Sequence, residues 1–296
     1  MTTIKQALSE ARNKLQTTSP SPAVDASTLL CHVLGCSPSH LIAWPDKELS
    51  QQQAVQFSDI LQQRNAGTPV AYITGEREFW SLPLKVTPDV LIPRPETETL
   101  VEFVLERFSD KTALSVADLG TGSGAIACAL AVEHPRWNIT ATDASSEALR
   151  IAQLNASAHK LENIRFLHGQ WFEPLAALDF DLIISNPPYV AINDPHLIEG
   201  DVRFEPEAAL ISGIQGMDAI AQLTRQAGNY LRTNGWLVVE HGYDQQRAVY
   251  NSFKHGGYED IVQLTDLAGQ PRVTAGRYTS PHFSPGSREQ AQDSCS

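Results

Sequence analysis

The stretch Asp118-Leu119-Gly120-Thr121-Gly122-Ser123-Gly124 lies between a predicted strand, residues 115–119, and a predicted helix, residues 125–133. Glycines at such a turn allow a tight bend and let a ligand approach the main chain closely. Asp143 ends the next predicted strand, where an acidic side chain can accept hydrogen bonds from both hydroxyls of a ribose. The stretch therefore predicts a Rossmann-like α/β fold that binds a cofactor containing a nucleoside.

The glycine stretch alone leaves two cofactors open. Gly120, Gly122 and Ala125 also fit the dinucleotide pattern G-x-G-x-x-G/A, so NAD is one of them. Asp118 favours the other, S-adenosylmethionine, because a carboxylate attracts a cationic amino group and a sulfonium but repels a pyrophosphate. A buried acid that caps the amides of the loop would explain Asp118 equally well.

Strands and helices alternate between Thr97 and Tyr278, which predicts a largely parallel, doubly wound sheet. The predicted strands share short apolar runs and cover residues 115–119, 139–142, 164–167, 180–185, 236–240, 261–264 and 272–278. The predicted helices share apolar residues at helical spacing and cover residues 100–108, 125–133, 147–159, 217–231 and 245–255.

The N-terminal part of the chain has a different pattern, which predicts a small domain of three or four helices. Apolar residues recur at helical spacing in residues 4–15 and 23–34. A further helix begins at Ser50, with Gln53 placed to form a capping box.

A hairpin or linker is predicted to connect the helical part with the α/β part. Residues 70–73 and 82–86 read as extended segments, and Pro93 and Pro95 disfavour a helix. The last segment is rich in Ser, Pro and Gln, which predicts disorder. The predicted boundaries are residues 1–70, 71–96, 97–278 and 279–296.

Asn186-Pro187-Pro188-Tyr189 follows the predicted strand 180–185 and indicates the chemistry. Ligands of such sheets bind at the carboxyl ends of the strands, so this loop borders the same crevice as the glycine loop. The proline pair holds the chain extended and directs the carbonyl of Pro187, and the Asn186 side chain offers a second acceptor oxygen. Two fixed acceptors can bind both hydrogens of an –NH2 group, and Tyr189 offers a flat face to a planar amide or base.

A nitrogen of this kind needs such acceptors because its lone pair is delocalised. Acceptors on its hydrogens return electron density to the nitrogen as a methyl group arrives, and in-line positioning lowers the barrier further. The sequence therefore predicts methylation of a planar amide or amino nitrogen without a strong general base. Glu240 and His241 end a predicted strand and could form an acid–base pair, but a histidine satisfied at a strand end is the commoner arrangement.

The composition limits the classes of function. The formal net charge is -12 and Lys and Arg are scattered singly, so we expect no stable binding to nucleic acid. The four cysteines form no C-x-x-C pair and have no His at zinc-ligand spacing, which predicts reduced thiols and no metal site. Residues 1–16 lack the apolar core of a signal peptide, and the longest apolar run, residues 125–132, is too short to span a membrane. We expect a cytoplasmic protein that does not bind membranes.

The sequence resembles the HemK/PrmC-type protein-glutamine N-methyltransferases, which modify the Gly-Gly-Gln loop of class-1 peptide chain release factors. The resemblance covers roughly residues 23–278. The Asn-Pro-Pro-Tyr motif is shared with amino-methyltransferases of DNA and RNA. More specific to the family are Arg77-Glu78-Phe79-Trp80, Leu91-Ile92-Pro93-Arg94-Pro95-Glu96-Thr97-Glu98, Asp201-Val202-Arg203-Phe204-Glu205-Pro206 and Arg272-Val273-Thr274-Ala275-Gly276-Arg277.

The resemblance implies a seven-stranded class I S-adenosylmethionine methyltransferase domain, preceded by a small helical domain that docks the substrate. It implies S-adenosylmethionine as cofactor and class-1 release factors as partners. Asp143 would hold the ribose, Trp171 would lie beside the adenine, and residues 91–94 would wall the glutamine pocket. The implied cofactor-binding residues are Gly120, Thr121, Gly122, Ser123, Gly124, Asp143, Trp171 and Asn186. The implied substrate-binding residues are Asn186, Pro187, Pro188 and Tyr189, with Asn186, Pro187 and Tyr189 as the catalytic ones.

Three alternatives remain open at this point. An adenine- or guanine-amino methyltransferase acting on nucleic acid would use the same motif, although a basic surface is missing. A nicotinamide-dependent oxidoreductase would explain the glycine loop but would leave the Asn-Pro-Pro-Tyr loop without a role. A ribosome-associated binding module would bind the cofactor without turning over any substrate.

Overall fold

The glycine stretch joins strand β3 (Ser115–Leu119) to helix α7 (Ala125–Glu133), as the sequence predicts. The computed structural model describes residues 2–108, 113–175 and 179–279, so the predicted disorder of the tail lies almost wholly outside the described residues. The chain divides into two compact units. The first comprises Met1–Glu78, Pro83–Ile92 and Asn193–Pro206, and the second comprises Phe79–Leu82, Pro93–Ile192 and Glu207–Ser296.

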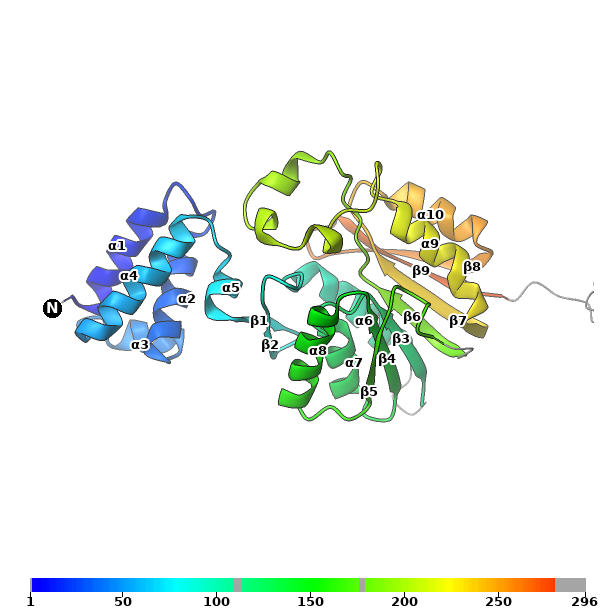
Figure 1. Cartoon of the computed structure of the whole chain (residues 1–296), viewed down its shortest axis with the longest axis horizontal. Coiled ribbons are helices and arrows are strands. Elements are labelled where there is room, and N and C mark those ends of the chain that lie inside the picture. Colours follow the sequence, from blue (N-terminus) through cyan, green and yellow to red (C-terminus); the bar gives the residue numbers. More distant parts are fainter. Residues whose placement is uncertain (1, 109–112, 176–178, 280–296) are drawn as a thin grey trace, which may run out of the picture. The chain divides into compact units, whose positions relative to one another are not determined.

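A seven-stranded sheet forms the centre of the second unit, which confirms the predicted Rossmann-like fold (Figure 1). The strand order is β5-β4-β3-β6-β7-β9-β8, and all neighbours are parallel except those of β9. The order reverses at β3, so the loops that follow β3, β4 and β6 meet at one edge of the sheet, where ligands of such folds bind. The other strands are β4 (Asn138–Asp143), β5 (Ile164–His168), β6 (Phe180–Ser185), β7 (Leu231–Glu240), β8 (Tyr258–Thr265) and β9 (Pro271–Tyr278).

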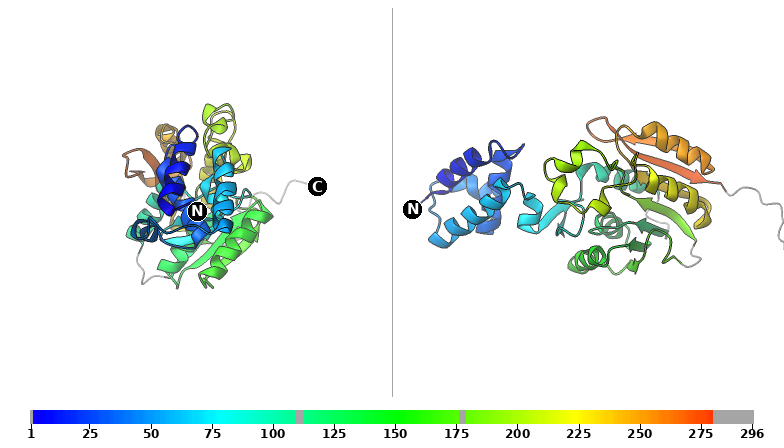
Figure 2. Two further views of the ribbon diagram at one scale, coloured as in Figure 1. Left: turned by 90° about the vertical axis from the view of Figure 1, so that its left-hand side faces the viewer. Right: turned by 45° about the horizontal axis from the view of Figure 1, so that its top comes forward.

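Helices cover both faces of this sheet. On one face lies a row of α6 (Glu98–Arg107), α7 and α8 (Ser146–Ala158). Because α7 lies between its two neighbours and the sheet, residues 125–131 are all buried, which explains why this helix is apolar on every side. On the other face, α9 (Asp218–Gln226) and α10 (Gln246–His255) lie side by side (Figure 2).

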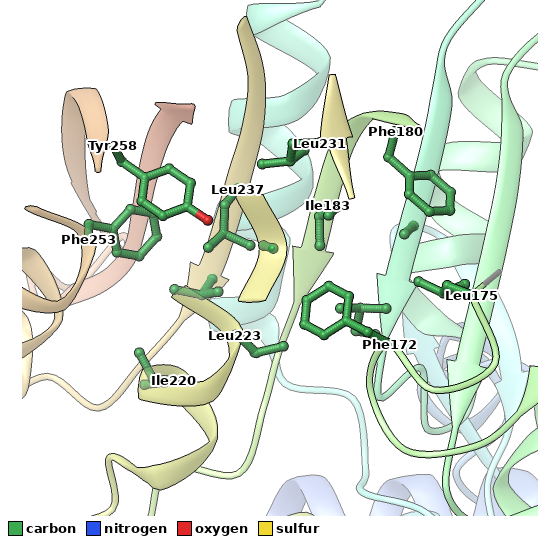
Figure 3. Packing of buried hydrophobic residues seen from close by; sticks show 14 of the residues in the cluster. Phe172, Leu175, Phe180, Ile183, Ile220, Leu223, Leu231, Leu237, Phe253 and Tyr258 are labelled. Atoms are coloured by element: carbon green, nitrogen blue, oxygen red, sulfur yellow. The ribbon is translucent and has the colours of Figure 1, made fainter. Parts of the chain in front are cut away.

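The core beneath α9 and α10 is built from alternate residues of the strands. Ile183 and Leu237 point towards Ile220 and Leu223 of α9, and Phe253 of α10 packs beside them (Figure 3). All five side chains are completely buried. Burial of a large apolar side chain contributes about 1.5–3 kcal/mol, so this cluster holds α9 and α10 against β6 and β7.

The first unit consists mainly of helices, as predicted. They are α1 (Ile4–Leu15), α2 (Pro22–Leu34), α3 (Pro38–Ala43), α4 (Gln51–Asn65) and α5 (Val70–Thr74), around an apolar core. The capping box predicted for Ser50 and Gln53 is confirmed, with the two reciprocal hydrogen bonds at 2.9 and 3.2 Å. A two-stranded hairpin follows, with β1 (Glu76–Phe79) and β2 (Leu82–Lys85). Short 3-10 helices are η1 (Pro95–Thr97), η2 (Pro195–Ile198), η3 (Val202–Phe204), η4 (Glu207–Ala209) and η5 (Ala227–Asn229).

Two predicted elements are wrong in part. Residues 70–73 form helix α5 rather than an extended segment, because Pro69 starts the turn, Gly75 ends it at φ +77°, and Val70 and Ile73 pack on the helical core. A run of four apolar residues does not distinguish a strand from a helical turn.

The predicted helix 217–231 is also too long. Helix α9 stops at Gln226, and Leu231 already pairs with Phe180 in the sheet. A Cβ at Gly228 would lie 2.5 Å from the ring of Tyr278, so this position needs a glycine, which is a poor helix former. None of the helices in the described part of the chain is long and apolar enough to cross a membrane.

Candidate active site

The three glycines of the loop after β3 are required for different reasons. Gly120, Gly122 and Gly124 have φ values of +74°, +57° and +80°, which favour glycine. A Cβ at Gly124 would lie 3.0 Å from the Cβ of Ala152 in α8, and a Cβ at Gly120 would lie 3.2 Å from the ring of Trp171. At Gly122, no atom of the described residues outside its chain neighbours lies within 4 Å of that position. Gly122 is therefore the glycine whose main chain a ligand can approach.

The N–H groups of Gly120, Thr121, Gly122 and Gly124 are already bonded within the protein. Those of Gly120 and Thr121 both donate to the carbonyl of Thr142 at 2.9 Å. The N–H of Gly122 donates to Oδ2 of Asp143 at 2.9 Å. A pyrophosphate needs several free N–H donors at this point, so the loop favours a cofactor without phosphates.

Asp118 lies beneath the loop and is completely buried. Its Oδ2 atom accepts a hydrogen bond from the hydroxyl of Thr121 at 2.6 Å, and among the described residues its Oδ1 atom has no hydrogen-bond partner. Burial raises the pKa of Asp118 to about 7. Thr121 and Ser123 are buried as well, so any contact they make with a cofactor would come from their main chain. Asp118 is therefore linked to the loop through the side chain of Thr121.

Asp143 and Trp171 lie next to the glycine loop. Besides Gly122, Asp143 accepts a hydrogen bond from the N–H of Ser145 at 2.8 Å, and burial raises its pKa. Each of its oxygens keeps a second lone pair for a ligand. Trp171 has a φ of +48°, a conformation that is strained for a bulky residue and is found mostly at functional sites. The structure thus brings together the residues predicted to hold the ribose and the adenine.

The Asn-Pro-Pro-Tyr loop begins where β6 ends, beside the end of β3. The hydroxyl of Ser185 donates to the carbonyl of Leu119 at 2.7 Å and joins the two strand ends. Asn186 is half-buried, and its Nδ2 donates to Oγ1 of Thr97 at 3.1 Å. Pro187 is buried and Pro188 is half-buried.

Both the side chain and the main chain of Tyr189 are hydrogen-bonded. Its hydroxyl donates to Oε1 of Glu240 at 3.2 Å, and its carbonyl accepts a hydrogen bond from Nε2 of Gln245 at 2.8 Å. Burial raises the pKa of Tyr189 above its usual range, so the phenol stays protonated and acts as a donor. The ring of Tyr189 therefore has one fixed orientation.

Glu240 ends strand β7 and His241 follows it, but the two do not form an acid–base pair. His241 is completely buried, and its ring nitrogens bond to the carbonyl of Gly242 at 2.9 Å and to Oγ1 of Thr274 at 2.9 Å. Burial lowers the pKa of His241, which favours the neutral ring. The prediction of a histidine satisfied at a strand end is confirmed, and only Glu240 faces the Asn-Pro-Pro-Tyr loop.

Thr97 and Gln245 contact this loop, although neither belongs to the site predicted from the sequence. Thr97 lies 89 positions before Asn186 and touches it through its hydroxyl. Gln245 precedes α10 and bonds to Tyr189. Thr97 belongs to one of the family-specific motifs, but neither residue carries a sequence signal for these contacts.

Family models match both parts of the chain. The PrmC N-terminal domain matches residues 6–75, and the methyltransferase small domain matches residues 97–198. Proteins called release factor glutamine methyltransferase align with nearly the whole chain. The relative from Vibrio cholerae is 50% identical over 281 residues, which are 93% of this chain and 97% of the relative. The relative from Escherichia coli K12 is 45% identical over 271 residues, 92% of this chain and 97% of the relative.

Solved structures support the fold. The catalytic domain of human Mettl16 in complex with an RNA hairpin has a TM-score of 0.56 at 13% identity and covers 85% of this chain and 91% of that chain. A Thermus thermophilus 16S rRNA methyltransferase in complex with AdoMet and guanosine has a TM-score of 0.53 at 17% identity, over 69% of this chain and 49% of that chain. Identities this low establish a shared fold and nothing about the acceptor.

Proposed function

This chain belongs to the family of release factor glutamine methyltransferases, and on that basis we propose that it methylates the glutamine of the Gly-Gly-Gln motif in class-1 peptide chain release factors. The methyl donor is S-adenosylmethionine, and the acceptor is the nitrogen of the glutamine side-chain amide. The observation that carries this proposal is the loop Asn186–Tyr189, fixed beside the glycine loop at the ends of β3 and β6. We expect the reaction to take place in the cytoplasm, because the release factor acts in translation.

The cofactor is held by groups that suit a nucleoside without phosphates. Asp143 accepts the ribose hydroxyls, Trp171 lies beside the adenine, and the main chain from Gly120 to Gly124 lies against the rest of the molecule. The open position at Gly122 and the internally bonded N–H groups of the loop support this assignment over a dinucleotide. S-adenosylmethionine supplies an electrophilic methyl group attached to a sulfonium.

The protein activates the glutamine by accepting its hydrogens. The Oδ1 atom of Asn186 and the carbonyl of Pro187 each accept one N–H of the substrate amide, and the ring of Tyr189 stacks on its plane. Electron density returns to the nitrogen, which forms a bond to the methyl carbon as the bond from that carbon to sulfur breaks. The nitrogen releases one proton to water, and the products are N-methylglutamine and S-adenosylhomocysteine.

The glycine loop provides a test of the cofactor assignment. Gly122→Ala places a methyl group where the cofactor lies against the main chain, so we expect the Kd for S-adenosylmethionine to rise at least tenfold, as measured by calorimetry. Gly257→Ala is the matched control, since Gly257 has φ +81° and also has open space around the added Cβ among the described residues. Both variants should lose about 1–2 kcal/mol of stability from backbone strain. Equal cofactor affinity in the two variants would contradict the assignment.

Charge is expected to govern the encounter with the release factor. The chain has a net charge of -12, and a factor that binds ribosomal RNA is expected to be basic. The kcat/KM for the release factor should therefore fall several-fold between low salt and about 0.15 M ionic strength, where the Debye length is about 8 Å. The Kd for S-adenosylmethionine, measured in the same buffers, is the control. A kcat/KM that does not respond to salt would rule out electrostatic steering.

The class of acceptor is tested directly with radiolabelled S-adenosylmethionine. We expect label to enter a purified class-1 release factor and not DNA or RNA oligonucleotides that contain adenine and guanine. If an oligonucleotide were labelled at a rate comparable with that of the release factor, the activity would be that of a nucleic-acid amino-methyltransferase.

A further inference from the structure

The Asn-Pro-Pro-Tyr loop must be fixed from outside, because two of its four residues are prolines. Pro187 and Pro188 have no N–H group and cannot donate a main-chain hydrogen bond. The start of the loop is joined to the sheet by the hydroxyl of Ser185, which donates to the carbonyl of Leu119 at 2.7 Å. The carbonyl of Pro187, the second acceptor of the proposed mechanism, keeps its direction only if the other end of the loop, at Tyr189, is fixed as well.

Gln245 fixes that end through main-chain atoms of three segments. Its Nε2 atom donates to the carbonyl of Tyr189 at 2.8 Å and to the carbonyl of Gly216 at 3.2 Å. Its Oε1 atom accepts a hydrogen bond from the N–H of Gly242 at 2.9 Å. One carboxamide therefore joins the motif to the loop before α9 and to the turn between β7 and α10.

The orientation of the Gln245 carboxamide follows from the chemistry of its partners. A main-chain N–H can only donate and a carbonyl can only accept, so Oε1 must face Gly242 and Nε2 must face Tyr189. A half-turn of the amide would place donor against donor at one end and acceptor against acceptor at the other. An ionised glutamate in this position would lack the donor, and an asparagine would be one methylene shorter.

The main chain approaches this carboxamide closely on two sides. A Cβ at Gly216 would lie 2.2 Å from the carbonyl oxygen of Tyr189 and 2.7 Å from Nε2 of Gln245. A Cβ at Gly242 would lie 3.1 Å from Oε1 of Gln245. Because these contacts are tight, the carbonyl of Tyr189 has little room to move while the carboxamide of Gln245 is in place.

The chain after the motif is held separately. The N–H of Val190 donates to the carbonyl of Leu210 at 2.8 Å, and the N–H of Ser212 donates to the carbonyl of Val190 at 2.9 Å. These bonds fix Val190 and the residues that follow it, whereas the contact of Gln245 reaches the motif itself. Loss of the Gln245 carboxamide is therefore expected to release the carbonyl of Tyr189 without unpairing Val190.

We propose that Gln245 is a positioning residue for methyl transfer, which fixes the main chain at Tyr189 so that the carbonyl of Pro187 keeps the direction in which it accepts the substrate amide. Gln245 does not touch the substrate and acts through the main chain of the motif. The identity of the acceptor in this inference rests on the proposed function.

Two variants of Gln245 test its role in the rate. Gln245→Glu keeps the size and the acceptor oxygen, and Gln245→Met keeps the length but removes both polar ends. Each should lower kcat about 10–100-fold, because a misplacement of about 1 Å can cost about 10²-fold in rate. The KM for the release factor and the Kd for S-adenosylmethionine should stay near the native values. A residue that only docked the release factor would raise KM instead.

Gln263→Met is the matched control. Gln263 is half-buried like Gln245, and its Nε2 atom also donates to a main-chain carbonyl at 2.8 Å, which is that of Gln246 in α10. This variant loses the same kind of hydrogen bond one residue away from Gln245, so it should have lower stability but the native kcat.

Gly216→Ala disturbs the same contact from the other side. Its added Cβ would displace the carbonyl of Tyr189 and Nε2 of Gln245, so kcat should fall as it does in the Gln245 variants. Gly269→Ala is its control, since Gly269 has φ +77° against +70° at Gly216 and, within the described part of the chain, open space around an added Cβ. The control should keep the native kcat.

A second readout does not depend on the acceptor. Tyr189-Val190 is the only Tyr-Val pair in the sequence, so protein labelled with carbonyl-¹³C tyrosine and ¹⁵N valine gives one HNCO signal, which joins the carbonyl of Tyr189 to the N–H of Val190. A hydrogen bond deshields a carbonyl carbon. The carbon resonance should therefore move upfield in Gln245→Glu and Gln245→Met and stay in place in Gln263→Met.

The two readouts separate this inference from the proposed function. If the resonance moved as expected but the native enzyme methylated no release factor, the proposed function would be wrong, while the fixing of Tyr189 by Gln245 would stand. An unmoved resonance in both Gln245 variants, a kcat within twofold of the native value in both, or an equal fall of kcat in Gln263→Met would overturn the positioning role.

Discussion

Replacing Asn186 with alanine is expected to lower kcat for methyl transfer by about 10²–10³-fold, the effect of removing one group that stabilises developing charge. The side-chain oxygen of Asn186 is one of the two acceptors on the substrate amide, and its interaction strengthens as the nitrogen becomes more positive in the transition state. The Kd for S-adenosylmethionine should change far less than kcat, because the glycine loop and Asp143 are untouched. Single-turnover rates with a saturating release factor measure the chemical step.

Two controls separate this effect from a general disturbance. Asn251→Ala removes an exposed asparagine of α10 and should have the activity of the native enzyme. Asn186→Asp keeps an acceptor oxygen but loses the donor to Thr97, so it should be slow as well. If Asn186→Ala transferred methyl groups within threefold of the native rate, the assignment of the acceptor role to this side chain would be wrong.

Replacing Arg64 with alanine is expected to cost the first unit about 3–5 kcal/mol of stability, the usual cost of leaving a buried charge without its partner. Arg64 is 3% exposed, and its guanidinium donates to Asp25 at 2.7 Å and to Asp201 at 2.7 Å. Asp25 is 7% exposed and also accepts from Ser19 at 2.7 Å. The variant therefore leaves a buried carboxylate without its cation. Urea unfolding followed by circular dichroism and by hydrogen exchange of α2 and α4 measures the loss.

An exposed ion pair serves as the control. Arg150 bonds to Glu147 at 2.9 Å, with the two side chains 52% and 56% exposed, so Arg150→Ala should change the free energy of unfolding by about 0–1 kcal/mol. If Arg64→Ala lowered the free energy of unfolding by less than about 1 kcal/mol, water would have to reach Asp25 and replace the guanidinium.

Local patterns of apolar and turn residues predict most of the fold, because the apolar residues of these patterns are also the ones that are buried in the folded protein. The strand before Gly120 and the strand before Asn186 are short apolar runs that end in turn residues, and both are found as predicted. Residues 70–73 show where this fails. Their apolar run suits a strand or a helical turn equally, and packing on the helical core decides for the turn.

The candidate site is predictable only as far as its motifs extend. Gly122 and Asp143 could be paired from the rule that strand ends meet at one edge of a parallel sheet. The contacts of Thr97 and Glu240 could not, since they join segments 89 and 51 residues from Asn186 and Tyr189. Such contacts depend on side-chain directions that no local pattern encodes.

The central claim is tested most directly by the mass of the acceptor. A purified class-1 release factor and a copy with the Gly-Gly-Gln glutamine changed to alanine are each incubated with the enzyme and S-adenosylmethionine. The intact mass of the unaltered factor should rise by one methyl group, which peptide fragmentation should locate on the side-chain nitrogen of that glutamine, while the mass of the altered copy stays the same. Methylation of both copies, or of neither while the enzyme binds the cofactor, would contradict the proposed acceptor.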